Sequence, residues 1–269
     1  GDSTFYQRNI TMPNLGYSMF MGCDNGLNDC NIWPRSDIEV IANSTKYYLN
    51  KDKFMTYYMS ISGHMEYNFK TNDIAIKNKD LVDKLDVSND IKAYFATQIE
   101  FDKSLELLLN RLEENNLLDD TIIVIAPDHY PYGLPTSEID EYMNIKDNYF
   151  DLYKNSLIIW NNGNYQDVVV DDYISSLDIL PTVLNLFGVD YDSRLLMGRD
   201  IFSNSEKIVI FSDRSWITNK AKYNYLTKKV IRLDNNVDKE YIDSINKIVN
   251  DKISISKLII NSNYYKYLR

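Results

Sequence analysis

The stretch that decides the fold is residues 121–129, TIIVIAPDH, together with the long segment before it. The apolar, β-branched run at 121–126 predicts a strand, and its lack of polar alternation indicates cover on both faces. From Ser88 to about residue 115, apolar residues recur at three- and four-residue steps, which predicts an amphipathic helix. A second apolar run, FMTYYMSI at 54–61, predicts a strand before this helix. Strand, helix and strand in this order are typical of a crossover unit in a parallel sheet.

The rest of the chain extends this α/β pattern. Ser36 and Glu39 have the spacing of a capping box, which predicts a helix over 36–49, whereas residues 68–87 are polar with no clear period. Further elements are expected as strands at 156–160, 168–170 and 207–211, a helix at 176–187, a hairpin sheet at 216–233 and a helix at 239–268. We therefore predict an α/β fold with a largely parallel central sheet flanked by helices, at 1–204. A small C-terminal subdomain of antiparallel sheet plus helix is predicted at 205–269.

Composition and charge narrow the classes of protein. The chain has 269 residues, of which 44% are hydrophobic and 25% charged, an ordinary globular balance. No apolar run approaches the roughly 20 residues that a membrane-spanning helix needs. The net charge of -10 disfavours a nucleic-acid binder. The chain starts with Gly1 and has no apolar leader, so we expect a processed or cloned piece of a longer protein.

Two cysteines, Cys23 and Cys30, lie seven residues apart in a polar segment. They form a disulfide if the protein is extracellular, or stay as two thiols beside a loop. A zinc site there is disfavoured, because no second pair of Cys or His residues lies nearby.

The only two histidines in the sequence, His64 and His129, each follow directly on a predicted strand. Ligands of open α/β sheets bind beyond the carboxyl ends of the strands, so both histidines are expected at the ligand-binding edge. Asp128 beside His129 can ligate a divalent ion such as Mn, Mg or Zn, the alternative being a capped strand end with a surface histidine. His64 can donate a hydrogen bond to an anionic substrate or act as a general acid, unless it is an ordinary loop residue.

Arginines offer a second kind of anion contact. Arg8 and Arg35 can bind phosphate or sulfate through their planar guanidinium groups, the alternative for each being a surface salt bridge. Arg199 is expected to be structural. The sequence contains no Gly-rich phosphate loop, no Gly-x-Ser-x-Gly elbow and no serine placed as a nucleophile.

Taken together, short motifs along the chain resemble those of the lipoteichoic acid synthase family. Its members are phosphoglycerol transferases of the alkaline phosphatase and sulfatase superfamily, and the resemblance is to the C-terminal part of their extracellular catalytic domain. The motifs keep the family order and are found at 4–8 (TFYQR), 13–17 (PNLGY), 33–37 (WPRSD), 62–64 (SGH), 120–124 (DTIIV), 128–130 (DHY), 177–182 (LDILPT) and 197–202 (MGRDIF).

This resemblance implies roles for particular residues. Asp128 and His129 match the family's metal-binding pair, with manganese as the usual metal and magnesium as a substitute. His64 matches a histidine that contacts the substrate phosphate. Arg8 matches an arginine that binds the phosphoglycerol group, and Tyr6 falls where the family often has an aromatic residue beside it.

The resemblance also implies what is missing. The family's threonine nucleophile and a further metal-binding glutamate have no match in this sequence, and neither do its membrane-spanning helices, which lie upstream. We therefore expect this chain alone to be inactive. The whole enzyme would work at the extracellular face of the bacterial cell membrane, in cell wall biogenesis. It would move glycerol phosphate from the phosphatidylglycerol headgroup to a growing glycerophosphate polymer.

Two alternatives to this function stay open. One is a hydrolase of the same superfamily, a sulfatase or a phosphodiesterase, with water as the acceptor. The other is a non-catalytic module that binds a glycerophosphate polymer. The acceptor, the true metal and the oligomeric state do not follow from the sequence.

Overall fold

A computed structural model of the chain describes residues 5–23, 25–27, 30–145, 147, 149–163 and 166–268. The chain divides into two compact units, residues 1–165 and 166–269. The boundary expected between residues 204 and 205 stays a prediction about the domain organisation.

Helices dominate both units, and none in the described part of the chain is long and apolar enough to cross a membrane. The elements of the first unit are η1 (Phe5–Gln7), α1 (Arg8–Asn14), α2 (Asp37–Ser44), η2 (Thr45–Tyr47), α3 (Asp73–Lys77), α4 (Lys79–Val82), α5 (Asn89–Glu114), β1 (Ile123–Ile125), α6 (Thr136–Met143), η3 (Asp151–Tyr153) and β2 (Ile158–Trp160). Those of the second unit are η4 (Ser176–Asp178), α7 (Ile179–Leu186), η5 (Ser193–Leu195), β3 (Val209–Ile210), β4 (Trp216–Ile217), β5 (Ala221–Tyr223), β6 (Val230–Arg232), α8 (Lys239–Asn261) and η6 (Tyr264–Tyr267).

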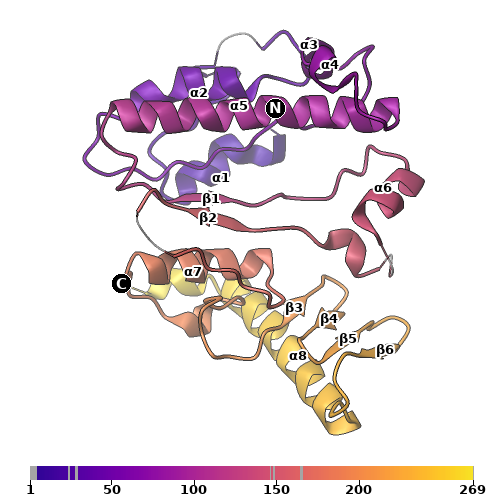
Figure 1. Ribbon diagram of the computed structural model, residues 1–269. Helices are drawn as coiled ribbons and strands as arrows, with labels where there is room; N and C mark the ends of the chain where they lie inside the picture. The colour runs from indigo at the N-terminus through magenta and orange to yellow at the C-terminus, as the bar shows by residue number, and fades with distance from the viewer. Residues whose placement is uncertain are drawn as a thin grey trace. The chain divides into compact units, whose positions relative to one another are not determined.

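The long helix α5 organises the first unit, and α2 lies along it (Figure 1). Ser88 caps α5, because its hydroxyl accepts a hydrogen bond from the Ile91 backbone N–H at 3.1 Å. The Ser36 hydroxyl accepts from the Glu39 N–H at 3.4 Å in the same way. Both predicted helix starts are therefore confirmed. One face of the pair encloses a small apolar core.

The strand after α5 is confirmed, but its partner differs from the expectation. β1 pairs with β2 in an antiparallel register that places Ile123 opposite Trp160. The α/β class is right, whereas every strand pair in the described residues is antiparallel and not parallel. Residues 54–61 form no strand. Phe54 and Tyr58 pack on the core between α2 and α5, as Ile123 does. The apolar residues at 54–61 are therefore explained by burial against these helices and not by strand pairing.

A second core of the first unit covers the other part of α5 and includes helices that the sequence did not indicate. The polar segment 68–87 contains α3 and α4. The Asn72 side chain caps α3 by accepting from the Ala75 N–H at 2.8 Å. Ile74 and Val82 are buried there, and these few apolar positions anchor helices too short to show a period.

The second unit consists of α7 and a four-stranded antiparallel sheet, in the order β3-β4-β5-β6, against which α8 packs. Trp216 on β4 is fully buried, and its indole N–H donates to the Asn246 side chain on α8 at 3.0 Å. The predicted hairpin sheet and C-terminal helix are thus confirmed. The short strand expected at 168–170 is absent, because Val168 and Val169 are exposed and unpaired in the sheets described.

Of the two alternatives for the cysteines, the structure has the disulfide. Cys23 and Cys30 are bonded, with their Cα atoms 5.7 Å apart. Beside Cys23, the Gly22 backbone N–H donates to the Asn25 carbonyl at 3.1 Å.

Candidate active site at two histidine loops

The first candidate loop follows β1 and carries Asp128 and His129. Asp128 Oδ1 lies 3.5 Å from His129 Nε2, and both side chains are well exposed. His129 Nδ1 lies 2.8 Å from the Tyr130 carbonyl oxygen, which can only accept. That contact favours the tautomer with the proton on Nδ1, so Nε2 keeps its lone pair on the side of the Asp128 carboxylate. Two metal-type donors therefore face the same region.

The second candidate loop carries His64 and is held by a buried carboxylate. Asp37, at the start of α2, accepts hydrogen bonds from the backbone N–H groups of Ile61 and Ser62 at 2.9 and 3.1 Å. It also accepts one from the Ser62 hydroxyl. At Gly63 a Cβ atom would lie 2.8 Å from the Gln98 side-chain nitrogen, so the loop approaches α5 closely. The backbone before His64 is thus fixed by two helices.

The His64 ring is oriented by its own neighbours. Its Nδ1 lies 3.0 Å from the Met65 carbonyl oxygen, which favours Nδ1–H and leaves Nε2 as an acceptor when the ring is neutral. Trp33 packs edge-on against the ring at 5.2 Å and donates its own N–H to the same carbonyl at 3.2 Å. A protonated His64 could present Nε2–H to an anion.

The two histidine loops pack against each other within the first unit. A Cβ atom at Gly133 would lie 2.8 Å from Met65 Cβ and 3.1 Å from the Tyr67 ring, so only glycine allows this approach. The Tyr67 hydroxyl donates to the Gly63 carbonyl at 3.0 Å. Burial raises the pKa of Tyr67, and the negative charge of Asp128 is among the smaller contributions to that rise. Tyr67 therefore links the loop of His64 to the loop of Asp128.

The predicted substrate residues Tyr6 and Arg8 lie together at the start of the described chain. The Arg8 guanidinium carbon is 5.3 Å from the centre of the Tyr6 ring, a cation–π distance. Tyr6 is 74% exposed. The structure thus pairs these two side chains, and their proximity to the histidine loops stays a prediction.

The structure explains the role of Arg199 but does not test anion binding by Arg35. Arg199 is structural as expected, because its backbone N–H donates to Asp178 and its guanidinium to the Ile208 carbonyl at 3.2 Å. Arg35 directly precedes the Ser36 cap of α2, and anion binding by Arg35 stays a prediction.

Sequence reasoning missed three residues that position the candidate site, namely Asp37, Tyr67 and Gly133. Asp37 lies within the motif at 33–37, but its partners are 24 and 25 residues away. The small residue at 133, between Tyr132 and Leu134, was the one available signal of a close approach.

Asp128 and His129 fit a divalent cation as part of a site. Carboxylate oxygen and imidazole nitrogen are ligands that Mn²⁺ accepts, and Mg²⁺ takes the carboxylate. Such ions take about six ligands, and the described residues contain no group of three or more His, Cys, Asp or Glu side chains able to hold one. Other donors must complete the coordination.

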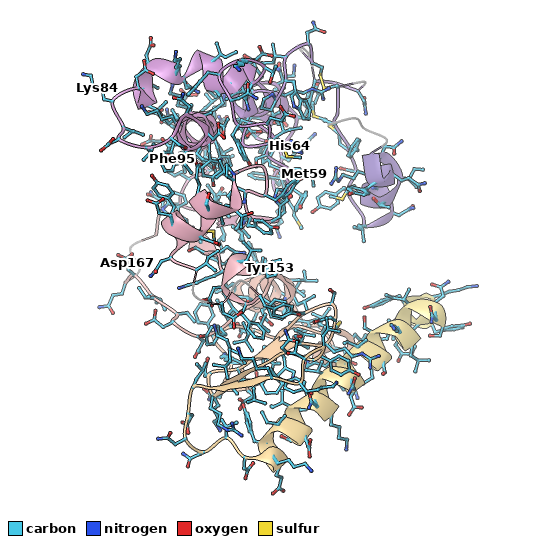
Figure 2. The ribbon with its side chains drawn as sticks, turned by 90° about the vertical axis from the view of Figure 1, so that its right-hand side faces the viewer. Met59, His64, Lys84, Phe95, Tyr153 and Asp167 are labelled. Atoms are coloured by element: carbon cyan, nitrogen blue, oxygen red, sulfur yellow. A yellow bond between two sulfur atoms is a disulfide. The ribbon has the colours of Figure 1, made fainter. Side chains whose placement is uncertain are left out.

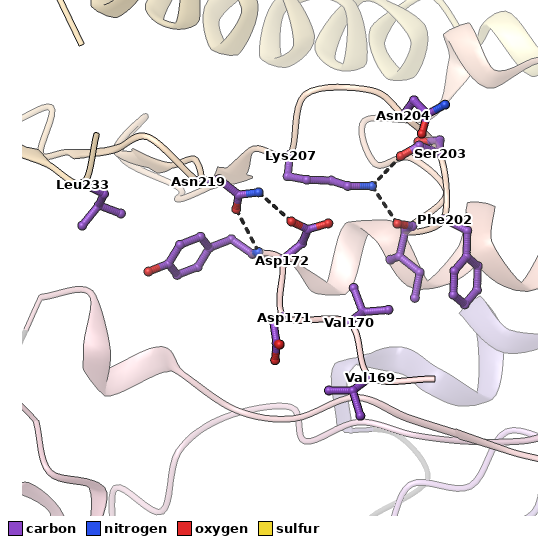
Figure 3. Close-up of a pocket in the computed structure, with 12 residues that line it drawn as sticks. Val169, Val170, Asp171, Asp172, Phe202, Ser203, Asn204, Lys207, Asn219 and Leu233 are labelled. Carbon is purple, nitrogen blue, oxygen red and sulfur yellow. Dashed lines mark hydrogen bonds between the residues drawn. The ribbon is translucent and has the colours of Figure 1, made fainter. Parts of the chain in front are cut away.

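The second unit contains a separate hollow of about 620 Å³ that none of the predicted site residues lines (Figure 3). Several of its polar groups bond to each other. Lys207 donates to the carbonyls of Ile201 and Ser203 at 2.6 and 2.7 Å, and Asn219 donates to Asp172 at 2.6 Å. The candidate active site is therefore the pair of histidine loops and not this hollow.

Comparison with known proteins assigns the family. The sulfatase family model matches residues 1–189, and the chain belongs to that family. Over 230 residues it is 28% identical to Lipoteichoic acid synthase 2 of Bacillus subtilis (strain 168), covering 80% of this chain and 33% of that protein. It is 23% identical to Lipoteichoic acid synthase of Staphylococcus aureus (strain USA300), covering 81% and 34%.

A solved structure supports the fold. The crystal structure of the lipoteichoic acid synthase LtaP from Listeria monocytogenes matches with a TM-score of 0.72 at 22% identity, over 96% of this chain and 68% of that one. The resemblance found in the motifs is thereby confirmed. The chain spans about a third of the length of the curated relatives it matches.

Proposed function

We propose that this chain forms part of a metal-dependent phosphoglycerol transferase of the sulfatase family. The observation that carries the proposal is the packing of the His64 loop against the Asp128–His129 loop. The curated relatives, named lipoteichoic acid synthases, support a glycerophosphate polymer as the product. The donor would be the phosphatidylglycerol headgroup, at the extracellular face of a bacterial membrane.

Different residues of this chain would bind the metal ion, the phosphate oxygens and the phosphoglycerol group. Asp128 and His129 would hold Mn²⁺ or Mg²⁺, which supplies a Lewis acid for phosphoryl oxygens. In its protonated form His64 would donate Nε2–H to a phosphate oxygen, while its Nδ1–H faces the Met65 carbonyl. Arg8 would pair with the phosphoglycerol group through its planar fork, with Tyr6 packed beside it. The threonine nucleophile and a further glutamate ligand would come from residues outside this sequence, so the chain alone would not turn over.

The test is an activity assay on a chain extended upstream to include the family's threonine and glutamate region. With Mn²⁺ and fluorescent phosphatidylglycerol, we expect release of diacylglycerol together with a growing glycerophosphate product. Asp128→Ala should lower the rate by about 100-fold or more, because it removes a metal ligand. Asp120→Ala is the matched control, since Asp120 is also exposed and lies before β1.

Three outcomes count against the proposal. Undiminished turnover in Asp128→Ala would show that Asp128 is not a ligand of the catalytic metal. Release of free glycerol phosphate with no polymer would indicate a phosphodiesterase, the hydrolase alternative. Polymer binding without any turnover in the extended chain would indicate the non-catalytic module.

A further inference from the structure

Beside the Asp128–His129 loop, the first unit contains a cavity of about 280 Å³. His129, a proposed metal ligand, is among the residues that line it, whereas the other lining residues have no role in the proposed function. The cavity is bounded by the first turns of α5, the loop after β1, α6, and η3 with the residues that follow it. Figure 2 shows Phe95 on α5 and Tyr153 on η3, two of its lining residues. This volume is slightly below that of usual small-molecule sites, so it suits a ligand of a few heavy atoms.

Aromatic rings form much of the wall of this cavity. The rings of Tyr130 and Tyr153 meet edge-on at 5.9 Å, and those of Tyr94 and Phe95 lie 5.9 Å apart. Tyr142 on α6 lines it as well. Tyr94 and Tyr130 pack against the core beneath, and each contacts a second ring, so this part of the wall is preformed.

One polar atom in this apolar surrounding lacks a partner. Glu138 Oε2 is buried and accepts no hydrogen bond from any described residue. Glu138 lines the same cavity from the first turn of α6. Leaving a buried carboxylate oxygen unsatisfied is costly, and a bound group of positive charge would offset that cost.

We propose that this cavity binds a small organic cation, an alkylated or quaternary ammonium group, with Glu138 as the counter-charge. Aromatic faces attract an ammonium group through their quadrupoles, and the nearby Glu138 carboxylate adds an attraction between opposite charges. The net charge of -10 favours the approach of cations. Lys154 also lines the cavity and is exposed, and its positive charge would compete with the bound cation.

The proposal is tested with choline and its neutral isostere 3,3-dimethyl-1-butanol, which have the same shape and hydroxyl group. Isothermal calorimetry at constant ionic strength should show choline binding at least tenfold more tightly than the isostere. In Glu138→Gln this preference should fall to within about twofold. Lys154→Met should increase the affinity for choline, because it removes a competing positive charge.

Glu141→Gln is the matched control, because Glu141 is exposed on the same helix and its replacement changes the net charge equally. It should leave choline binding unchanged, and melting curves should show that both variants fold. Equal binding of choline and the isostere, or equal losses in the Glu138 and Glu141 variants, would overturn the proposal. Manganese affinity should be the same in Glu138→Gln and wild type, so this result and the failure of the proposed function are distinguishable.

Discussion

Replacing Gly198 with alanine should destabilise the second unit by about 3 kcal/mol or more. A Cβ atom at this position would run into the backbone carbonyl of Leu177 and lie 2.8 Å from the Asp178 nitrogen. Backbone atoms at the start of a helix cannot give way as a side-chain tip can. The same displacement would break the bond from the Arg199 N–H to Asp178, which is 2.9 Å long.

Chemical unfolding followed by the fluorescence of buried Trp216 measures this effect in the second unit. Gly188→Ala is the informative control, because a Cβ there meets nothing within 4 Å but the residue has a positive φ of 63°. Backbone strain alone should cost it about 1–2 kcal/mol. A Gly198→Ala protein as stable as wild type would show that residues 177–178 and 198 do not pack as described.

Asp37→Asn should lower the free energy of unfolding by about 1–3 kcal/mol at neutral pH. Asp37 is 4% exposed and uses both carboxylate oxygens to accept from the Ile61 and Ser62 backbone N–H groups. An amide of the same shape has only one accepting oxygen, so one of these N–H groups would face a donor. The loop that carries His64 would lose its fixed position.

The same residue gives a pH dependence of defined sign. Burial raises the pKa of Asp37 above its ordinary value of 3.8, although hydrogen bonds from Ser62 and Ile61 oppose the rise. Between 3.8 and the higher folded-state value, the folded chain binds more protons than the unfolded chain. The protonation-dependent part of the stability that Asp37 supplies is therefore complete below pH 3.8 and is lost as pH rises through that window, whereas its hydrogen bonds to the backbone still contribute at neutral pH.

Urea unfolding at a series of pH values measures both effects of the Asp37 change. The stability difference between wild type and Asp37→Asn should be largest in acid and shrink as pH rises. Asp52→Asn, at an exposed position, should stay within about 0.5 kcal/mol of wild type at every pH. A difference that grows with pH would show that the Asp37 pKa is lowered and not raised.

The long helices could be predicted from the sequence because their signals are local. Ser88 and the apolar spacing of α5 lie within one segment, and so do the corresponding features of α2 and α8. Strand pairing depends on residues that are far apart in the sequence. The partner of Ile123 is Trp160, 37 residues later, and nothing in either run specifies an antiparallel neighbour. The helices α3 and α4 are too short for a period to emerge.

The same difference between local signals and long-range contacts applies to the candidate site. The placement of His64 and His129 after apolar runs was enough to propose that they share one site. The expected sheet edge is wrong for His64, because residues 54–61 form no strand, but the close approach at Gly133 brings the two loops together. Asp37 and Tyr67, which hold the His64 loop, act through contacts with its backbone that no local pattern records.

The most direct test of the shared site is the paramagnetic effect of Mn²⁺ on the histidine rings by NMR. The chain has two histidines, so His64→Gln and His129→Gln assign both ring signals without ambiguity. Because paramagnetic broadening falls steeply with distance, Mn²⁺ held by Asp128 and His129 should broaden both signals over the same range of metal concentration. Asp128→Ala should abolish both effects, and Mg²⁺ should cause none. Broadening of His129 alone, or of neither ring at excess Mn²⁺, would contradict the account.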